Sequence, residues 1–285
     1  MWCKRLATQH YENFSVASWL LPSWLREEYF ALYAFARCAD DLADEQVGNS
    51  PVTAESSESR LRSLENWEAM LNEIYDGIEP IHPVFIALEP VIHSKRLEKE
   101  LFVKLLDAFR RDQVQKRYDT WDDLRGYTSG SADPIGRLVL RLHGYRDHSF
   151  DQLSDSICTG LQLVNFLQDI KSDYLKRDRI YLPLEDIEKY GVSEKMISRV
   201  PSPLALQKLV AFESERAERL LSLGKTLIDK VKPLLERQLI LFHGGGRLAL
   251  DSIRRAQYDT NSRQRNVKIL SKFALFMRAF QGKSI

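Results

Sequence analysis

The sequence predicts an all-α protein, and three features support this. Apolar residues recur at helical spacing along most long segments, and no stretch shows the strict alternation typical of a strand. The 285 residues are 44% hydrophobic, which is enough for a large core. Residues 31–45 and 162–173 are apolar on more sides than a surface helix and carry paired aspartates. Since we find neither an internal repeat nor a strong linker, we expect residues 1–285 to form a single domain.

The expected elements of the first third follow the helix and turn signals. A proline–serine pair marks a break before Trp24, so a helix should run from Trp24 through the first aspartates. Residues 48–59 are polar and rich in Pro, Gly and Ser, which predicts a mobile loop, either a lid or a connector. Residues 60–76 predict an amphipathic helix, and three prolines between 80 and 90 divide the segments that follow.

Later helices are expected at residues 95–118, 121–130, 134–142, 162–173, 204–231 and 234–257. The last of these is crossed by Gly244, Gly245 and Gly246. These glycines do not form a phosphate loop, because the motif G-x-x-x-x-G-K-[ST] and a preceding strand are both absent. We interpret them as a site of close helix packing or a kink.

The first aspartate motif lies in A-L-Y-A-F-A-R-C-A-D-D-L-A-D-E, residues 31–45. Asp40 and Asp44 are four residues apart, and Arg37 lies one turn before Asp40 on the same side. The second motif is Q-L-V-N-F-L-Q-D-I-K-S-D, residues 162–173. Its polar residues are spaced three, four and four apart and should share one helix face: Gln162, Asn165, Asp169 and Asp173. Apolar residues fill the other directions.

A narrow polar stripe on an apolar helix indicates a buried helix whose polar edge faces a cavity; the alternative is a solvated face with ordinary aspartates. Carboxylates that face a cavity together repel each other, and a divalent cation relieves this repulsion. Two D-x-x-x-D helices facing each other across a bundle would offer oxygen ligands, which suit Mg²⁺ better than Zn²⁺. Mg²⁺ completes its shell with water and substrate phosphate.

A family resemblance rests on these motifs. D-D-L-A-D at 40–44 and N-F-L-Q-D-I-K-S-D at 165–173, followed by R-I-Y-L-P at 179–183, resemble the squalene/phytoene synthase family. The resemblance extends from N-F-S-V-A-S-W-L-L-P at 13–22 to A-Q-Y-D at 256–259, so it covers nearly the whole chain. The H-Y-E-N-F opening and the N-F-L-Q-D form are most similar to the bacterial hydroxysqualene synthases of the hopanoid pathway.

The resemblance implies a head-to-head isoprenoid synthase domain, a helical bundle with a central apolar cavity that binds Mg²⁺ and presqualene or farnesyl diphosphate. It assigns metal binding to Asp40, Asp44, Asn165, Asp169 and Asp173. These aspartates would also be catalytic, together with Arg37 and Tyr127. Substrate contacts are implied for Asn13, Phe14, Tyr33, Arg37, Gln162, Asn165, Gln168, Arg179 and Tyr258. Asp133 stands where the family more often has Asn, and we assign it no chemical role.

The chemistry expected of such a site is ionisation of a diphosphate ester. Lys176, Arg177 and Arg179 form a basic cluster that could bind the leaving diphosphate, although helix C-termini attract cations in any case. Aromatic faces would stabilise the carbocation by about 0.5–2 kcal/mol each. The candidates are Phe14, Tyr33, Phe35, Tyr127, Phe166 and Tyr258, most of which we expect to be core.

The product is suggested by Gln168. Phytoene and dehydrosqualene synthases tend to read N-I-L-R-D, whereas this chain has a neutral amide before Asp169, which could orient a water molecule. Capture of water by the cation would give hydroxysqualene without a reductant. Two alternatives stay open: a synthase that makes presqualene diphosphate, dehydrosqualene or phytoene from two prenyl diphosphates, and a non-catalytic helical scaffold.

Composition and the chain ends bear on partners and location. A net charge of +1 argues against a nucleic-acid surface, and Cys3, Cys38 and Cys158 lack metal-type spacing, as expected of reduced cytoplasmic thiols. The first residues lack the apolar core of a signal peptide, and no apolar run reaches the roughly 20 residues of a membrane span. Residues 267–285 interleave apolar and basic side chains. They fit an interfacial helix on the inner face of the membrane or, alternatively, a segment docked on the bundle.

Overall fold

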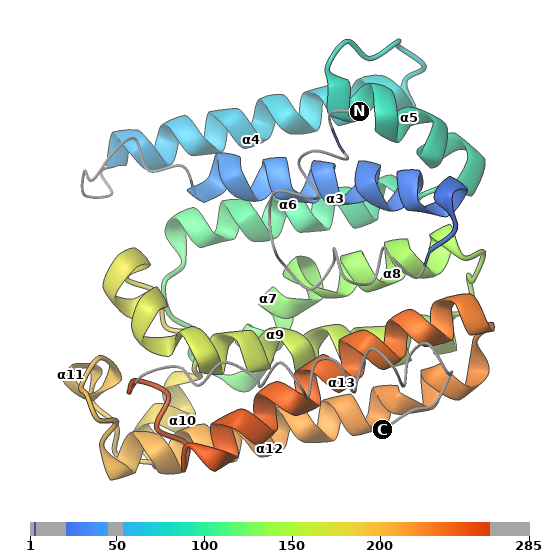
Figure 1. Cartoon of the computed structure of the whole chain (residues 1–285). Helices are drawn as coiled ribbons and strands as arrows, with labels where there is room; N and C mark the ends of the chain where they lie inside the picture. Colours follow the sequence, from blue (N-terminus) through green and yellow to red (C-terminus); the bar gives the residue numbers. More distant parts are fainter. Residues whose placement is uncertain (1–2, 4–20, 45–53, 263–285) are drawn as a thin grey trace. The chain divides into compact units, whose positions relative to one another are not determined.

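The computed structural model describes residues 3, 21–44 and 54–262 (Figure 1). Within these residues the chain is helical and has no strand, so the predicted all-α class is confirmed. The α-helices are α3 (Ser23–Asp44), α4 (Ala54–Tyr75), α5 (Pro83–Lys95), α6 (Lys99–Val114), α7 (Trp121–Ser131), α8 (Asp133–Leu142), α9 (His148–Arg177), α10 (Leu184–Lys189), α11 (Glu194–Ile197), α12 (Leu204–Gly224) and α13 (Pro233–Arg255). A 3₁₀ helix, η1 (Lys225–Lys230), follows α12.

The described chain divides into two compact units. The first contains the described residues up to Gln115 and the segment Pro134–Asp147, and the second contains Lys116–Asp133 and the chain from His148 onward. We describe each unit by itself. The single domain expected from the sequence stays a prediction.

Two expected boundaries are wrong. Helix α4 begins at Ala54, so the loop predicted at 48–59 is helical in its second half, while 48–53 lie outside the described residues. Acidic residues are favoured near a helix N-terminus, and Glu58 pairs with Arg62 one turn later at 3.0 Å. The helix predicted at 95–118 is interrupted, because Arg96 adopts a left-handed conformation (φ 47°) between α5 and α6. The sequence has no glycine there to signal this break.

The core of the first unit forms where α3 packs against α4, α5 and α6. Phe35 of α3 is fully buried, and its ring centroid lies 5.9 Å from that of Trp67, 5.9 Å from that of Phe85 and 5.0 Å from that of Phe102. Such edge-on and tilted contacts are typical of a packed aromatic core. Phe35, a candidate cation-stabilising ring in the sequence, is therefore a core residue.

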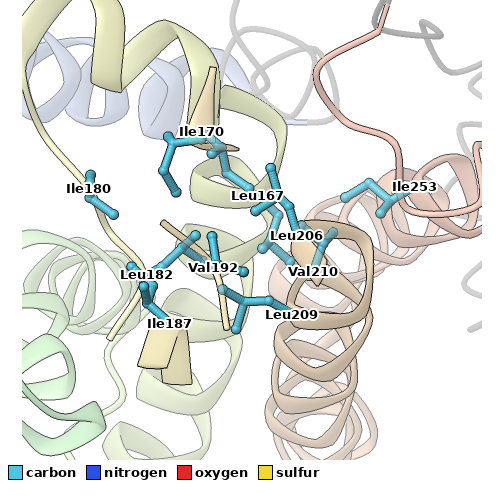
Figure 2. Close-up of a cluster of buried hydrophobic side chains, with 11 residues drawn as sticks. Leu167, Ile170, Ile180, Leu182, Ile187, Val192, Leu206, Leu209, Val210 and Ile253 are labelled. Atoms are coloured by element: carbon cyan, nitrogen blue, oxygen red, sulfur yellow. The ribbon is translucent and has the colours of Figure 1, made fainter. Parts of the chain in front are cut away.

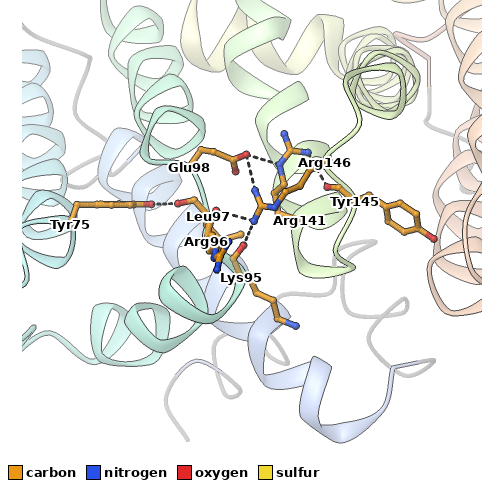
Figure 3. Close-up of polar contacts among 8 residues, drawn as sticks. All are labelled: Tyr75, Lys95, Arg96, Leu97, Glu98, Arg141, Tyr145 and Arg146. Atoms are coloured by element: carbon orange, nitrogen blue, oxygen red, sulfur yellow. Dashed lines mark hydrogen bonds and ion pairs between the residues drawn. The ribbon is translucent and has the colours of Figure 1, made fainter.

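Polar contacts fix the turn between α5 and α6 (Figure 3). The Glu98 carboxylate accepts from Arg141 Nε at 2.8 Å and from Arg146 Nη1 at 3.2 Å. Arg146 also donates to the carbonyl oxygens of Lys95 and Arg96. The Arg141 and Arg146 guanidinium groups and the Glu98 carboxylate thus hold the left-handed residue and join the end of α8 to this turn.

In the second unit, α9 packs against α12, α13 and α7. Leu167 and Ile170 of α9 belong to a buried cluster with side chains of α10, α12 and α13, and Figure 2 shows these side chains converging between the helices. The apolar side of the second aspartate motif is therefore buried, as predicted. This packing holds the helix that carries Asp169 and Asp173.

Two glycines let the helices of this unit approach closely. A Cβ atom placed on Gly160 would lie 2.9 Å from Leu221 Cγ, and one placed on Gly246 would lie 2.6 Å from Leu161 Cδ2. A Cβ on Gly245 would meet nothing within 4 Å. Close helix packing is therefore confirmed at Gly246, whereas Gly245 has space for a side chain.

No helix in the described part of the chain is long and apolar enough to cross a bilayer. Residues 267–285, the predicted interfacial helix or docked tail, lie outside the described residues.

Candidate active site

The first aspartate motif occupies the C-terminal end of α3 in the first unit. Arg37 Nη2 lies 2.6 Å from Asp41 Oδ1, and Nη1 lies 3.4 Å from Asp40 Oδ2, so Arg37 pairs more closely with Asp41 than with the predicted Asp40. Asp44 is the last residue of the helix, and Tyr33 lies one turn before Arg37; both are half-buried. The helix macrodipole is negative at this end, and the clustered carboxylates add to that charge. This end of α3 therefore attracts a cation.

Gln113 supports this helix end and was not found from the sequence. Its buried amide Nε2 donates to the carbonyl oxygen of Ala43 at 3.1 Å and to that of Phe109 at 3.2 Å. Arg60 donates to the Gln113 side-chain oxygen at 3.4 Å. Carbonyl groups in the last turn of a helix have no partner within the helix, and Gln113 satisfies one of them. No spacing in the sequence distinguishes Gln113 from other polar residues of α6.

The second motif lies on α9 in the second unit, and its polar stripe is only partly buried. Asn165 and Asp169 are exposed, Gln162 and Gln168 are half-buried, and Asp173 is buried with 8% of its surface exposed. The polar edge of α9 is therefore open at Asn165 and Asp169 and closed at Asp173, and its predicted position in a cavity stays a prediction.

The pKa of Asp173 is the one most clearly perturbed in this motif. Its pKa is raised from the usual 3.8 to about 6, first by burial and then by the negative charge of Asp169 one turn earlier. Arg177, whose Nη1 lies 3.3 Å from Asp173 Oδ1, and Arg179 act in the opposite direction. Two carboxylates thus repel each other at the end of α9.

The donor set fits Mg²⁺ in its chemistry. Among residues 3, 21–44 and 54–262 there is no group of three or more His, Cys, Asp or Glu side chains that could hold a metal ion. Each motif offers a pair of carboxylates, and Mg²⁺ typically takes one or two from a protein. The repulsion that raises the Asp173 pKa is also what a bound cation would relieve.

The chain turns sharply after α9. Asp178 has a positive φ of 52°, and the Arg179 N–H donates to the carbonyl oxygen of Asp173 at 3.1 Å. Beyond it, the Ile180 N–H donates to the carbonyl oxygen of Lys116 at 3.0 Å. Arg179 is buried and its charge acts on Asp173. The structure therefore brings together Asp169, Asp173 and Arg179, three of the predicted site residues.

Four aromatic rings pack together in the second unit, and we call them the aromatic stack: Tyr118, Tyr127, Phe166 and Tyr181. Phe166 and Tyr181 are nearly parallel at 4.1 Å between centroids, and Tyr127 lies 5.4 Å from Tyr181 and 5.3 Å from Tyr118. The sequence indicated Tyr127 and Phe166 but missed the other two. Tyr181 lies within R-I-Y-L-P at residues 179–183, where the motif and its basic residues, not the ring, indicate function.

Three predicted substrate residues remain. Tyr258 follows α13 with φ 62°, is half-buried, and packs against the apolar cluster that contains Leu167 and Ile170 of α9. Asn13 and Phe14 lie outside the described residues.

A buried network beside the stack joins α7 to α9 through Asp133. Its carboxylate pairs with Arg125 Nη1 at 2.7 Å and accepts from Thr159 Oγ1 at 2.9 Å. Burial raises the Asp133 pKa to about 6, and the charge of Asp155 adds to this effect. Thr159 could not be predicted as a partner of Asp133, since the bond between them spans 26 residues.

A second buried network joins α12 to α10. Arg216 Nη1 lies 2.6 Å from Glu213 Oε1 and 2.9 Å from Asp186 Oδ2, and its guanidinium lies 4.6 Å from the ring centroid of Trp121. Glu213 is 1% exposed. Burial raises its pKa to about 7, Arg216 lowers it, and Asp186 raises it. The Arg216 guanidinium thus pairs with two carboxyl groups, and the pKa of the buried Glu213 is raised to about 7.

Comparisons with known proteins agree with the motifs. A family model described as squalene/phytoene synthase matches residues 7–271. A hydroxysqualene synthase from Rhodopseudomonas palustris is 32% identical over 225 residues, which cover 79% of this chain and 73% of that protein. A hydroxysqualene synthase from Zymomonas mobilis is 34% identical over 212 residues, which cover 74% of this chain and 67% of that protein.

A solved structure extends the comparison. The crystal structure of squalene synthase HpnC from Alicyclobacillus acidocaldarius matches with a TM-score of 0.81 at 40% identity, covering 90% of this chain and 93% of that chain.

Proposed function

The chain belongs to the squalene/phytoene synthase family, and we propose that within it the protein converts presqualene diphosphate to hydroxysqualene. The observation that carries this proposal is the pair of D-x-x-x-D helices, read together with relatives named hydroxysqualene synthase. The reaction takes up water and releases diphosphate and a proton, so no reductant is consumed.

We assign Mg²⁺ binding to Asp40, Asp44, Asn165, Asp169 and Asp173. When bound, Mg²⁺ would neutralise charge on the diphosphate oxygens as the C–O bond breaks. Arg37 and Arg179 would hold the diphosphate by charge-assisted hydrogen bonds. The buried position of Arg179 supports its role, because a guanidinium shielded from water attracts an anion more strongly.

The carbocation formed on ionisation needs a pocket that excludes bulk water until the rearranged cation captures a single water molecule. The aromatic stack supports this role, since it offers ring faces and is largely buried beside α9. We assign cation stabilisation to Tyr127 and Phe166, with Tyr33 and Tyr258 as further substrate contacts. Gln162 and Gln168 offer amides on the polar stripe, and Gln168 would orient the attacking water.

Product analysis tests the proposal. Purified protein incubated with Mg²⁺ and presqualene diphosphate should yield hydroxysqualene by mass spectrometry, and added NADPH should change nothing. Gln168→Arg, which inserts the residue typical of phytoene and dehydrosqualene synthases, should lower the hydroxysqualene share. Phytoene, dehydrosqualene or NADPH-dependent squalene as the main product would contradict the proposal and leave the family assignment standing.

A second candidate is condensation or reduction within the same family. The similarity to a protein named squalene synthase favours it, and incubation with farnesyl diphosphate alone separates the two. A non-catalytic scaffold would bind neither Mg²⁺ nor a non-hydrolysable farnesyl diphosphate analogue in calorimetry.

We also propose that the protein is cytoplasmic and contacts the membrane peripherally through residues 267–285. Liposome flotation with and without this tail tests the proposal.

A further inference from the structure

Arg117 clamps the turn that follows α9. It lies between α6 and α7, and its side chain is 22% exposed. Nη1 donates to the carbonyl oxygen of Asp178, Nη2 lies 2.8 Å from Asp178 Oδ1, and Nε lies 3.0 Å from Glu194 Oε1. Its guanidinium also lies 5.9 Å from the ring centroid of Tyr174. One planar group thus binds both the main chain and the side chain of a single residue.

Asp178 is the residue at which the chain changes direction. Its φ of 52° falls in the left-handed region, which Asp tolerates better than most residues but does not prefer. The next two amides are both used: that of Arg179 binds the Asp173 carbonyl oxygen, and that of Ile180 binds the Lys116 carbonyl oxygen. The conformation of Asp178 therefore decides where Arg179 lies relative to Asp173.

We infer that Arg117 is a positioning residue for diphosphate binding, and this inference rests on the proposed function. By binding the carbonyl oxygen and Oδ1 of Asp178, it fixes the left-handed turn and keeps Arg179 beside Asp173 before a ligand arrives. A turn fixed in advance lowers the entropic cost of binding. The role requires the fork of a guanidinium, because the point charge of a lysine cannot bind two fixed oxygens and Glu194 together.

Three variants separate this role from a general effect on folding. Arg117→Met removes the clamp, and Arg117→Lys keeps the charge but not the fork. The matched control is Glu194→Gln, which weakens the far contact and leaves both bonds to Asp178 in place. The measurements are the Kd of inorganic diphosphate in the presence of Mg²⁺, by calorimetry, and hydrogen exchange of the amides at 178–184.

Arg117→Met should raise the Kd about tenfold, because the turn would then have to be ordered when the diphosphate binds. Arg117→Lys should raise it less, by about fivefold, and Glu194→Gln should stay within about twofold. Exchange at 178–184 should rise in the same order. Steady-state kinetics should show the loss mainly in KM for the diphosphate substrate.

A second pair of variants tests the turn itself. Asp178→Val, whose branched side chain disfavours positive φ, should raise the Kd in an otherwise natural chain. Asp178→Gly should restore part of the affinity lost in Arg117→Met, because glycine enters the left-handed region without steric cost. These variants also carry the test if Arg117→Met fails to fold.

The outcomes are distinct. An unchanged Kd in Arg117→Met, with faster exchange or lower thermal stability, would overturn the positioning role and leave the proposed function standing. A wild-type chain that binds no Mg²⁺–diphosphate would overturn the proposed diphosphate site and, with it, this inference.

Discussion

Replacing Glu213 by Gln should stabilise the protein at pH 8 and have little effect at pH 5. Burial raises the Glu213 pKa to about 7, against 4.5 for an ordinary glutamate. As the pH rises above 4.5, the unfolded chain loses this proton while the folded chain keeps it, so stability is lost until about pH 7. At about 1.4 kcal/mol per pH unit, the loss is about 3 kcal/mol at pH 8. A glutamine is neutral throughout and can still bond Arg216 and Asp186.

Denaturant unfolding followed by far-UV circular dichroism, at pH 5, 6, 7 and 8, measures this difference. Comparing the variant with wild type cancels the contributions of Asp133 and Asp173, whose pKa values are also raised to about 6. Glu215→Gln, 69% exposed on the same helix, is the matched control and should change stability by less than about 0.5 kcal/mol. If Glu213→Gln were less stable by the same amount at every pH, Glu213 would be an ionised partner of Arg216 and the reasoning would fail.

Two further predictions concern the metal ligands and the helix packing. Asp40→Asn and Asp169→Asn should each lower turnover by about 100-fold or more with unchanged helix content; near-normal turnover in either would end the assignment. Without substrate, Asp169→Asn should raise the melting temperature, since it removes a repulsive charge. Gly245→Ala should gain about 0.5–1 kcal/mol, whereas Gly246→Ala should be the less stable of the two variants because its Cβ meets Leu161 Cδ2, which has to shift. Equal effects of the two alanines on thermal unfolding would refute the packing argument.

Most of the helices could be predicted because the pattern that indicates a helix lies in residues close together in the sequence. The apolar face of α9 and the start of α3 follow from periodicity and a turn signal, which depend on residues close in sequence. The break at Arg96 could not be predicted, since its left-handed conformation is held by Arg146, 50 residues later. Helix α4 began earlier than predicted because a polar, serine-rich composition describes loops and helix N-termini equally well.

The residues of the candidate site also fall into those that the sequence predicts and those that only the structure shows. The aspartates and Arg37 were found because their spacing places them on one helix face. The partners that support them were not, because they come from distant segments: Gln113 binds Ala43 across 70 residues, and Arg117 binds Asp178 across 61. Only the folded chain brings these pairs into contact.

Two tryptophans with packed surroundings lie in different units. Trp67 contacts Phe35 and Phe85 in the first unit, and Trp121 lies beside the Arg216 guanidinium in the second. Indole emission shifts to longer wavelength when water reaches the ring, so each unit carries its own intrinsic fluorophore. A chain that keeps only Trp67 or only Trp121 would therefore report the melting of one unit without an added label. Coincident transitions would make the chain one cooperative domain, and separate midpoints would give each unit a stability of its own.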